Sequence, residues 1–175
     1  VLVALCVAGE WYVGAQNRLI HESRRSLNDP FATPYVLMEP ASTSASAPVA
    51  ILLHGRRCSS SMMIALGRML ARNGVTALIP DMPGHGLSQD GIELSCGSAP
   101  PWKFCELPTD QVSIPMLKAF VAQEGLGQRP IVLIGHSWGG VIADTLPKSP
   151  EGAALGNIAA IINLEGVIPK PESAV

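Results

Sequence analysis

Four short, uninterrupted runs of apolar residues constrain the fold of this 175-residue chain more than any other feature. A strand that is apolar throughout is buried on both faces, which is typical of the inner strands of a parallel sheet. Segments with helical spacing separate the runs, and right-handed crossovers place such helices on both faces of the sheet. The sequence therefore predicts an α/β domain with a mostly parallel sheet. The four runs are Val49–Leu53, Val75–Ile79, Ile131–Ile134 and Ile158–Leu164.

Three of the intervening segments are predicted to be helices. The first covers Ser60–Asn73 and ends at Gly74, because glycine is typical of the position just after a helix. The second covers residues 114–124, with Pro115 tolerated in its first turn, and the third covers Gly140–Leu146. The apolar residues expected on one side of the first helix are Met62, Met63, Leu66, Met69 and Leu70.

The N-terminal part begins with a short apolar run, Val1–Gly9, which Trp11 and Tyr12 follow. A membrane-spanning helix needs about 20 apolar residues, and the run Val1–Gly9 is shorter than that. We therefore expect residues 1–30 to hold the end of a membrane anchor or signal whose beginning lies outside this sequence. That would make the protein membrane-anchored, secreted or periplasmic, with membrane contact through the N-terminus. The alternative is a buried strand or helix in a cytoplasmic protein. Residues 31–175 would form the α/β domain.

Three further elements are expected before the first apolar run. Asn17–Ser26 is polar and is predicted as a helix, Pro34–Met38 as an edge strand, and Ala41–Pro48 as a hairpin-like connection or linker.

Composition excludes several function classes. The net charge is −2, with 47% hydrophobic and 15% charged residues, which excludes a disordered chain and gives no basic surface for nucleic acid. The four cysteines have no zinc-site spacing. Cys96 and Cys105 could pair outside the cytosol; the alternative is that all four thiols are free.

The segment Gly135-His-Ser-Trp-Gly139 has the form G-x-S-x-G and lies between an apolar strand and a helix. A sharp turn there forces strained backbone geometry on the serine, and glycines are needed where a Cβ would touch the neighbouring chain. The serine hydroxyl then projects at a helix N-terminus, where backbone N–H groups favour an oxyanion. The pattern predicts that Ser137 is a nucleophile.

Together with His54-Gly55 at a strand end and a D-x-P-G-H-G-x-S loop over Asp81–Ser88, this motif resembles the α/β-hydrolase superfamily over roughly residues 49–169. The resemblance implies that the backbone N–H groups of Arg56 and Trp138 form an oxyanion hole. It also implies that the Asp81–Ser88 loop is structural. The expected fold is an α/β-hydrolase domain that is C-terminally incomplete.

A serine nucleophile needs a histidine base and a carboxylate that orients it. In the resembled family the histidine follows the acid, well beyond the nucleophile, but the last histidine of this chain is His136. We therefore expect the catalytic histidine beyond residue 175. Glu165, at the end of the fourth apolar run, is a candidate acid; the alternatives are a later residue, or a Glu165 that only borders the cleft.

The remaining candidates concern the substrate. Arg56 and Arg57 could attract an anionic group, or could simply be solvated. The predicted reaction is hydrolysis of a carboxylic ester, amide or thioester through an acyl-enzyme, without metal or organic cofactor. The alternative is a ligand-binding protein or lyase on the same fold. The residues expected to line the substrate site are His54, Gly55, His136 and Trp102, with bracing of the neighbouring loop as the alternative for His54.

Overall fold

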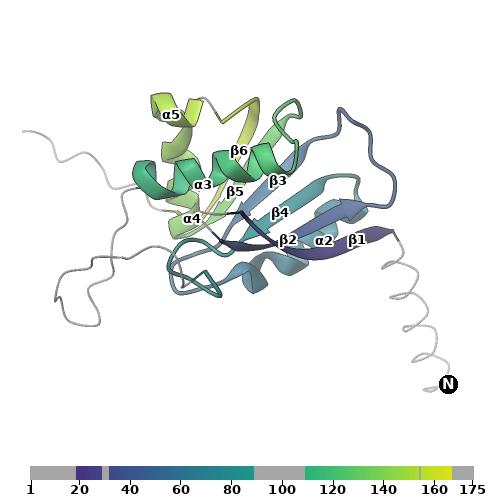
Figure 1. Cartoon of the computed structure of the whole chain (residues 1–175), viewed down its shortest axis with the longest axis horizontal. Helices are drawn as coiled ribbons and strands as arrows, with labels where there is room; N and C mark the ends of the chain where they lie inside the picture. Colours follow the sequence, from purple (N-terminus) through teal and green to yellow (C-terminus); the bar gives the residue numbers. More distant parts are fainter. Residues whose placement is uncertain (1–18, 29–31, 89–108, 154, 167–175) are drawn as a thin grey trace, which may run out of the picture.

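The computed structural model describes residues 19–28, 32–88, 109–153 and 155–166, and over these ranges the chain forms one sheet between helices (Figure 1). The sheet order is β1-β2-β4-β3-β5-β6. The four strands from β4 to β6 run parallel, while β1 and β2 are antiparallel to their neighbours. The predicted, mostly parallel α/β fold is confirmed. The strands are β1 Ile20–Ser26, β2 Pro34–Pro40, β3 Val49–Leu53, β4 Thr76–Pro80, β5 Ile131–His136 and β6 Ile158–Leu164.

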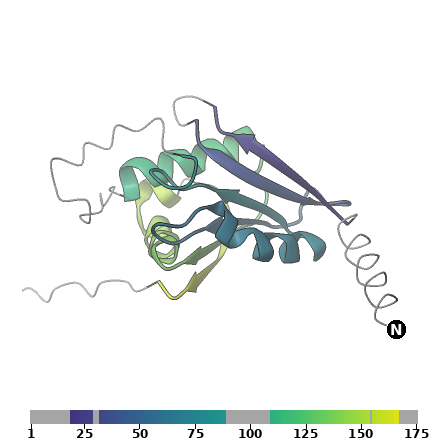
Figure 2. The same cartoon turned by 90° about the horizontal axis from the view of Figure 1, so that it is seen from below.

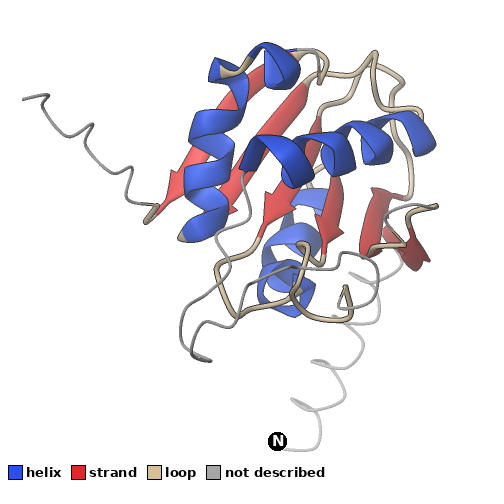
Figure 3. Ribbon diagram, turned by 60° about the vertical axis from the view of Figure 1, so that its left-hand side comes forward, coloured by secondary structure: helices blue, strands red, loops and turns tan. Residues whose placement is uncertain are grey.

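Helices cover both faces of the sheet, as predicted. The helix α2 lies on one face, and α3, α4 and α5 lie on the other (Figures 2 and 3). Their bounds are α2 Ile64–Arg72, which follows a 3₁₀ turn over Ser60–Met63, then α3 Thr109–Gln123, α4 Trp138–Thr145 and α5 Pro150–Ala153, with a 3₁₀ turn over Leu146–Lys148 before α5.

Strand β3 shows why its residues are apolar throughout. Val49, Ile51 and Leu53 pack into the core on the α3 and α4 side, whereas Ala50 and Leu52 pack into the core on the α2 side. All five residues are at most 1% exposed. Successive side chains of a strand point to opposite faces, so a strand between two helical layers has no polar face.

The N-terminal elements differ from the sequence-based expectation. Ile20–Ser26, expected as part of a helix, is strand β1, and it pairs antiparallel with β2 from Ile20↔Pro40 to Ser26↔Pro34. Strand β2 is consequently internal, not an edge strand, and the sheet begins ahead of the expected boundary at residue 31. The segment 41–48 connects β2 to β3, which β4 separates in the sheet, so it is not a hairpin.

The buried side of α2 differs from the prediction in part, because Met63, Leu66 and Leu70 pack into the core as expected whereas two methionines do not. Met62 and Met69 are 42% and 53% exposed, whereas Gly67 and Ala71 are buried. A Cβ on Gly67 would lie 2.5 Å from the Cδ1 atom of Ile79, so the helix approaches β4 too closely for larger side chains. Gly74 has φ +85° just after the helix, which confirms it as the stop.

The helix predicted over residues 114–124 is longer than expected. Helix α3 begins at Thr109, so Pro115 lies inside it and not in its first turn. Pro115 is exposed, while Ile114, Met116 and Phe120 are buried against the sheet. The tertiary contacts of these apolar residues stabilise the helix on both sides of the proline.

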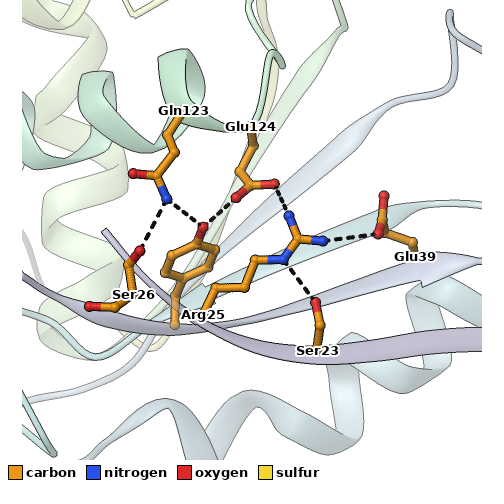
Figure 4. A network of polar contacts seen from close by, with 7 residues as sticks. Ser23, Arg25, Ser26, Glu39, Gln123 and Glu124 are labelled. Atoms are coloured by element: carbon orange, nitrogen blue, oxygen red, sulfur yellow. Dashed lines mark hydrogen bonds and ion pairs between the residues drawn. The ribbon is translucent and has the colours of Figure 1, made fainter. Parts of the chain in front are cut away.

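A polar network ties the β1–β2 pair to the end of α3 (Figure 4). The Arg25 Nη1 atom donates to Glu124 Oε2 at 2.6 Å, and the Tyr35 hydroxyl donates to the other oxygen of Glu124. The Gln123 amide donates to the Tyr35 hydroxyl at 2.9 Å and to the Ser26 carbonyl at 3.1 Å. Burial and the bond to Glu124 raise the pKa of Tyr35 to about 12.

None of the helices within the described ranges is long and apolar enough to cross a membrane. The expected membrane anchor or signal falls mainly on residues 1–18, which lie outside the described residues, as do Cys6, Cys96, Trp102 and Cys105. Cys58, the cysteine within the described ranges, is a free thiol.

Candidate active site

The residue Ser137 occupies the sharp turn between β5 and α4, as the motif predicts. Its backbone has φ 52° and ψ −117°, a conformation that L-residues rarely adopt. A Cβ on Gly135 would lie 2.0 Å from the Gly139 carbonyl oxygen, and one on Gly139 would lie 2.2 Å from the Leu53 carbonyl oxygen. The two glycines of the motif are therefore required by close backbone contacts.

Three strained residues meet at this edge of the sheet. Arg57 has φ 63°, Ser137 has φ 52° and Glu165 has φ 62°, and they follow β3, β5 and β6, which are neighbours in the sheet. Left-handed backbone in residues other than glycine is costly and is concentrated at functional sites. Ligands of open α/β sheets also bind at the carboxyl ends of the strands. This edge is therefore the candidate active site.

The chain segments on both sides of Ser137 contact it directly. A Cβ on Gly55 would lie 3.3 Å from the Ser137 Cβ, so the turn after β3 packs against the serine. The Ser137 N–H donates to the Leu164 carbonyl at 2.8 Å, and a Cβ on Gly166 would lie 2.8 Å from the Ser137 carbonyl oxygen. Glu165 lies between these two contacts and is consequently beside the nucleophile candidate.

The direction of the Arg56 N–H, one of the two predicted oxyanion donors, follows from the direction of the Gly55 carbonyl, because both groups belong to the same peptide unit. The Gly55 carbonyl accepts hydrogen bonds from His54 Nδ1 at 2.8 Å and from the Cys58 N–H at 3.2 Å. In a trans peptide the N–H points opposite to the C=O. The Arg56 N–H therefore points away from the buried His54 ring.

The second predicted donor is oriented in the same way. The Ser137 carbonyl accepts from the Gly140 N–H at 2.9 Å and from the Val141 N–H at 3.1 Å, so the Trp138 N–H points out of the N-terminus of α4. The first N–H groups of a helix have no partner within the helix, and its dipole favours a negative charge there. The Trp138 N–H is thus directed out of the helix next to Ser137, at a position where a negative charge is favoured.

His54 is positioned by two hydrogen bonds within the protein. Its Nε2 atom accepts from the Met82 N–H at 2.9 Å, so its Nδ1 atom carries the proton and donates to the Gly55 carbonyl. The residue is 0% exposed, and burial lowers the pKa of His54, which holds the ring neutral. These features favour the loop-bracing interpretation of His54 over contact with a substrate.

The Asp81–Ser88 loop is fixed by Asp81, a buried residue. Its carboxylate accepts from the Ser60 N–H at 2.6 Å and the Leu87 N–H at 2.8 Å. The His85 ring of this loop stacks on the Trp138 ring, with centroids 5.3 Å apart. This contact with the residue after the nucleophile was not predicted from the sequence, where its only signal is the place of His85 in the loop motif.

His136 and Glu165 form a loose pair next to Ser137. The His136 Nε2 atom lies 3.9 Å from Glu165 Oε2, and the Glu165 side chain is 89% exposed. The His136 Nδ1 atom is buried without a hydrogen-bond partner among the described residues, and a Cβ on Gly55 would lie 3.0 Å from it. The His136 ring therefore lies close both to the turn after β3 and to the turn after β6.

No described histidine is placed as the base of Ser137. The ring contacts of His54, His85 and His136 within the described ranges go to other groups. His21 lies on β1, at the opposite edge of the sheet from β6.

Asn163 is a further positioning residue that was not predicted from the sequence. Its Oδ1 atom accepts from the Gly166 N–H at 2.6 Å, and its Nδ2 atom donates to the Gly166 carbonyl at 3.0 Å and to Asp144. These bonds fix the turn that carries Glu165. A signal was present, because asparagine is typical of turns, where its side chain bonds to nearby backbone groups.

Comparisons with known proteins agree with this fold. The model of the Alpha/beta hydrolase family matches residues 50–172. The Magnesium-chelatase 30 kDa subunit of Rhodobacter capsulatus is 33% identical over 129 residues, which are 70% of this chain and 38% of that protein.

Solved structures share the fold. A thioesterase domain from the curacin biosynthetic pathway superposes with a TM-score of 0.58 at 22% identity, over 88% of this chain and 49% of that one. An epoxide hydrolase from Vigna radiata superposes with a TM-score of 0.51 at 19% identity, over 82% of this chain and 38% of that one. The chain thus spans less than half the length of each of these relatives.

Proposed function

The chain belongs to the alpha/beta hydrolase family, and from that premise we propose that it carries the nucleophile of a serine hydrolase. The substrate class is a carboxylic ester, or an amide or thioester with the same acyl chemistry. The observation that carries the proposal is the backbone of Ser137, held at φ 52° between β5 and α4, with the Trp138 N–H directed out of the helix next to it.

The proposed reaction has two steps. The Ser137 Oγ atom attacks the substrate carbonyl and forms a C–O bond, while a base takes the hydroxyl proton. The N–H groups of Arg56 and Trp138 stabilise the negative oxygen of the tetrahedral intermediate. The proton then passes to the leaving alcohol as its C–O bond breaks. Water releases the acyl group from the serine by the same sequence of transfers.

The base is proposed to be a histidine that follows residue 175 in a longer protein. Glu165 is the candidate carboxylate that would orient it, because Glu165 follows β6 and is next to the Ser137 backbone. A residue later in the chain is the alternative acid. In the present structure His136 Nε2 lies 3.9 Å from the Glu165 carboxylate. Glu165→Gln in the full-length protein should lower kcat by at least tenfold if it is the acid.

A fluorophosphonate probe on the full-length protein tests the proposal, because such a probe bonds to an activated serine. Labelling and hydrolysis of 4-nitrophenyl butyrate should both disappear in Ser137→Ala. Ser46→Ala is the matched control: Ser46 is exposed and lies before β3, at the opposite end of the strand from the site. Absence of labelling in the natural protein, or labelling that survives Ser137→Ala, would contradict the proposal.

A second candidate function is ligand binding without turnover. The observation in its favour is the 33% identity to a protein described as a magnesium-chelatase subunit, a name that denotes a component of another enzyme's assembly. In that case the oxyanion donors would hold a ligand oxygen, and Ser137 would resist the probe. Ligand affinity in Ser137→Ala would then equal that of the natural protein.

A further inference from the structure

Two consecutive arginines form the corner of the turn that follows β3. The Cys58 N–H donates to the Gly55 carbonyl at 3.2 Å, so Arg56 and Arg57 occupy the two central positions of a four-residue turn. Both residues are exposed. On its buried side, the turn is fixed by the hydrogen bond between the His54 ring and the Gly55 carbonyl. Two cationic side chains are thus carried by a rigidly placed segment of backbone.

The turn is close to the nucleophile. A Cβ on Gly55, the residue before Arg56, would lie 3.3 Å from the Ser137 Cβ. A substrate carbonyl that reaches both Ser137 Oγ and the Arg56 N–H would therefore bring its substituents near these arginines.

Arg57 holds a conformation that favours glycine. Its φ is 63°, at the third position of the turn, where glycine or asparagine is typical because neither is strained there. An arginine at such a position carries a steric cost, and strain of this kind points to a functional role for the residue. Arg57 follows a strand at the same edge of the sheet as Ser137 and Glu165, the other strained residues there, and this assigns the role to the active site.

The charges of the site are arranged with one sign on each side of Ser137. The arginines follow β3, Ser137 follows β5 and Glu165 follows β6, in the order of the sheet. Neighbouring strands are about 4.8 Å apart, so the ends of β3 and β6 are separated by about 10 Å. An anionic substituent would be attracted to the β3 side and repelled from the β6 side, which fixes the direction in which a substrate lies.

We propose that the turn Arg56–Arg57 recognises a carboxylate on the substrate, so that the site prefers the half-ester of a dicarboxylic acid to a neutral ester. This inference rests on the proposed function, because it names the substrate class of the same site. The guanidinium group suits the role, since its planar donors match the two oxygens of a carboxylate.

Binding to a variant that cannot turn over tests the inference. Full-length protein carrying Ser137→Ala is titrated by calorimetry with monoethyl glutarate, which keeps one carboxylate, and with diethyl glutarate, in which both are esterified. We expect the half-ester to bind at least tenfold more tightly at low salt. The preference should fall at least threefold in 0.5 M NaCl, because salt screens exposed charges.

Substitutions of the arginines test whether the preference for the half-ester over the diester comes from the Arg56–Arg57 turn. Arg57→Gln, in the same Ser137→Ala background, should lose most of it, and Arg57→Lys should keep part of it. Lys148→Gln removes one positive charge beyond the C-terminal end of α4 and should leave the preference intact. Equal binding of the two esters, or a preference that survives the Arg56→Gln/Arg57→Gln double variant, would overturn the inference.

Failure of the serine hydrolase proposal and failure of the arginine proposal can be distinguished, because the binding assay needs no hydrolysis. A natural protein that resists the fluorophosphonate probe contradicts the serine hydrolase, whatever the binding preference. A labelled, active enzyme whose Ser137→Ala variant binds both esters equally contradicts only the role of the arginines.

Discussion

The Nε2 atom of His54 accepts a hydrogen bond from the backbone N–H of Met82 at 2.9 Å, and this bond fixes the tautomer of the ring. With Nε2 as acceptor, the proton must lie on Nδ1, which donates to the Gly55 carbonyl. That carbonyl in turn sets the direction of the Arg56 N–H. A neutral, buried histidine thereby links the strand end of β3, the loop after β4 and one proposed oxyanion donor.

This relationship predicts a pH dependence of stability. Burial lowers the pKa of His54 in the folded protein, whereas the unfolded chain keeps a value near 6.5. Below about pH 6.5 the unfolded state therefore binds more protons, and the free energy of unfolding falls as the pH is lowered. Urea unfolding between pH 7.5 and 5.5 should show this loss. His54→Gln, which keeps one donor and one acceptor but does not titrate, should show a shallower loss; an unchanged slope would contradict the assignment.

The strain at Ser137 predicts an unusual order of stabilities. Ser137→Gly relieves about 1–3 kcal/mol of backbone strain but costs about 0.5–1 kcal/mol in chain entropy, so we expect a net gain of about 1 kcal/mol. Ser137→Ala keeps the strain and should change the free energy of unfolding by less than about 0.5 kcal/mol. Urea denaturation of the three proteins measures both. A glycine variant less stable than the alanine variant would show that the turn is not strained.

How far the sequence predicts this structure depends on whether a feature has a local cause. Strand β3 was predictable because burial on both faces requires an uninterrupted apolar run. The Ser137 turn was predictable because its close backbone contacts require glycine at fixed positions. Strand β1 was not, since its polar residues are held in a strand by pairing with β2. The left-handed conformations of Arg57 and Glu165 were also hidden, because neither residue type indicates positive φ.

The same distinction explains the site. The direction of the Trp138 N–H could be predicted from its motif position, because the sharp turn at Ser137 determines where this N–H points. The stacking of His85 on Trp138 joins segments that are far apart in sequence, and the clamp that Asn163 places on Gly166 holds a turn against the Ser137 backbone. The first contact follows from the assembled sheet, whereas the Asn163–Gly166 bond is local in sequence and only the position of its turn against Ser137 depends on the sheet.

Two glycines with different surroundings predict two different costs. Gly74 has φ +85° and no atom lies within 4 Å of the position that a Cβ would take, so Gly74→Ala should cost only the conformational strain, about 1–2 kcal/mol. Gly139→Ala would put a Cβ 2.2 Å from the Leu53 carbonyl oxygen and 2.7 Å from that of His54. We expect a loss above about 4 kcal/mol, or insoluble protein. Urea denaturation compares them; similar small losses would refute the close contact between α4 and β3.

The network at the end of α3 predicts a loss of stability at high pH. Burial and the hydrogen bond to Glu124 raise the pKa of Tyr35 from 10.0 to about 12. Between these values the unfolded chain has released the phenolic proton and the folded chain has not, so the free energy of unfolding falls as the pH rises from 10 to 12.

Tyr35→Phe removes the titrating group, so the free energy of unfolding should depend less on pH over this interval. The variant should be less stable at neutral pH, because Glu124 loses a hydrogen-bond donor. Urea unfolding at several pH values, with the absorbance at 295 nm recording ionisation of the phenol, measures both effects. A Tyr35 that ionises near its ordinary pKa would mean that the β1–β2 pair is not held against α3 by this bond.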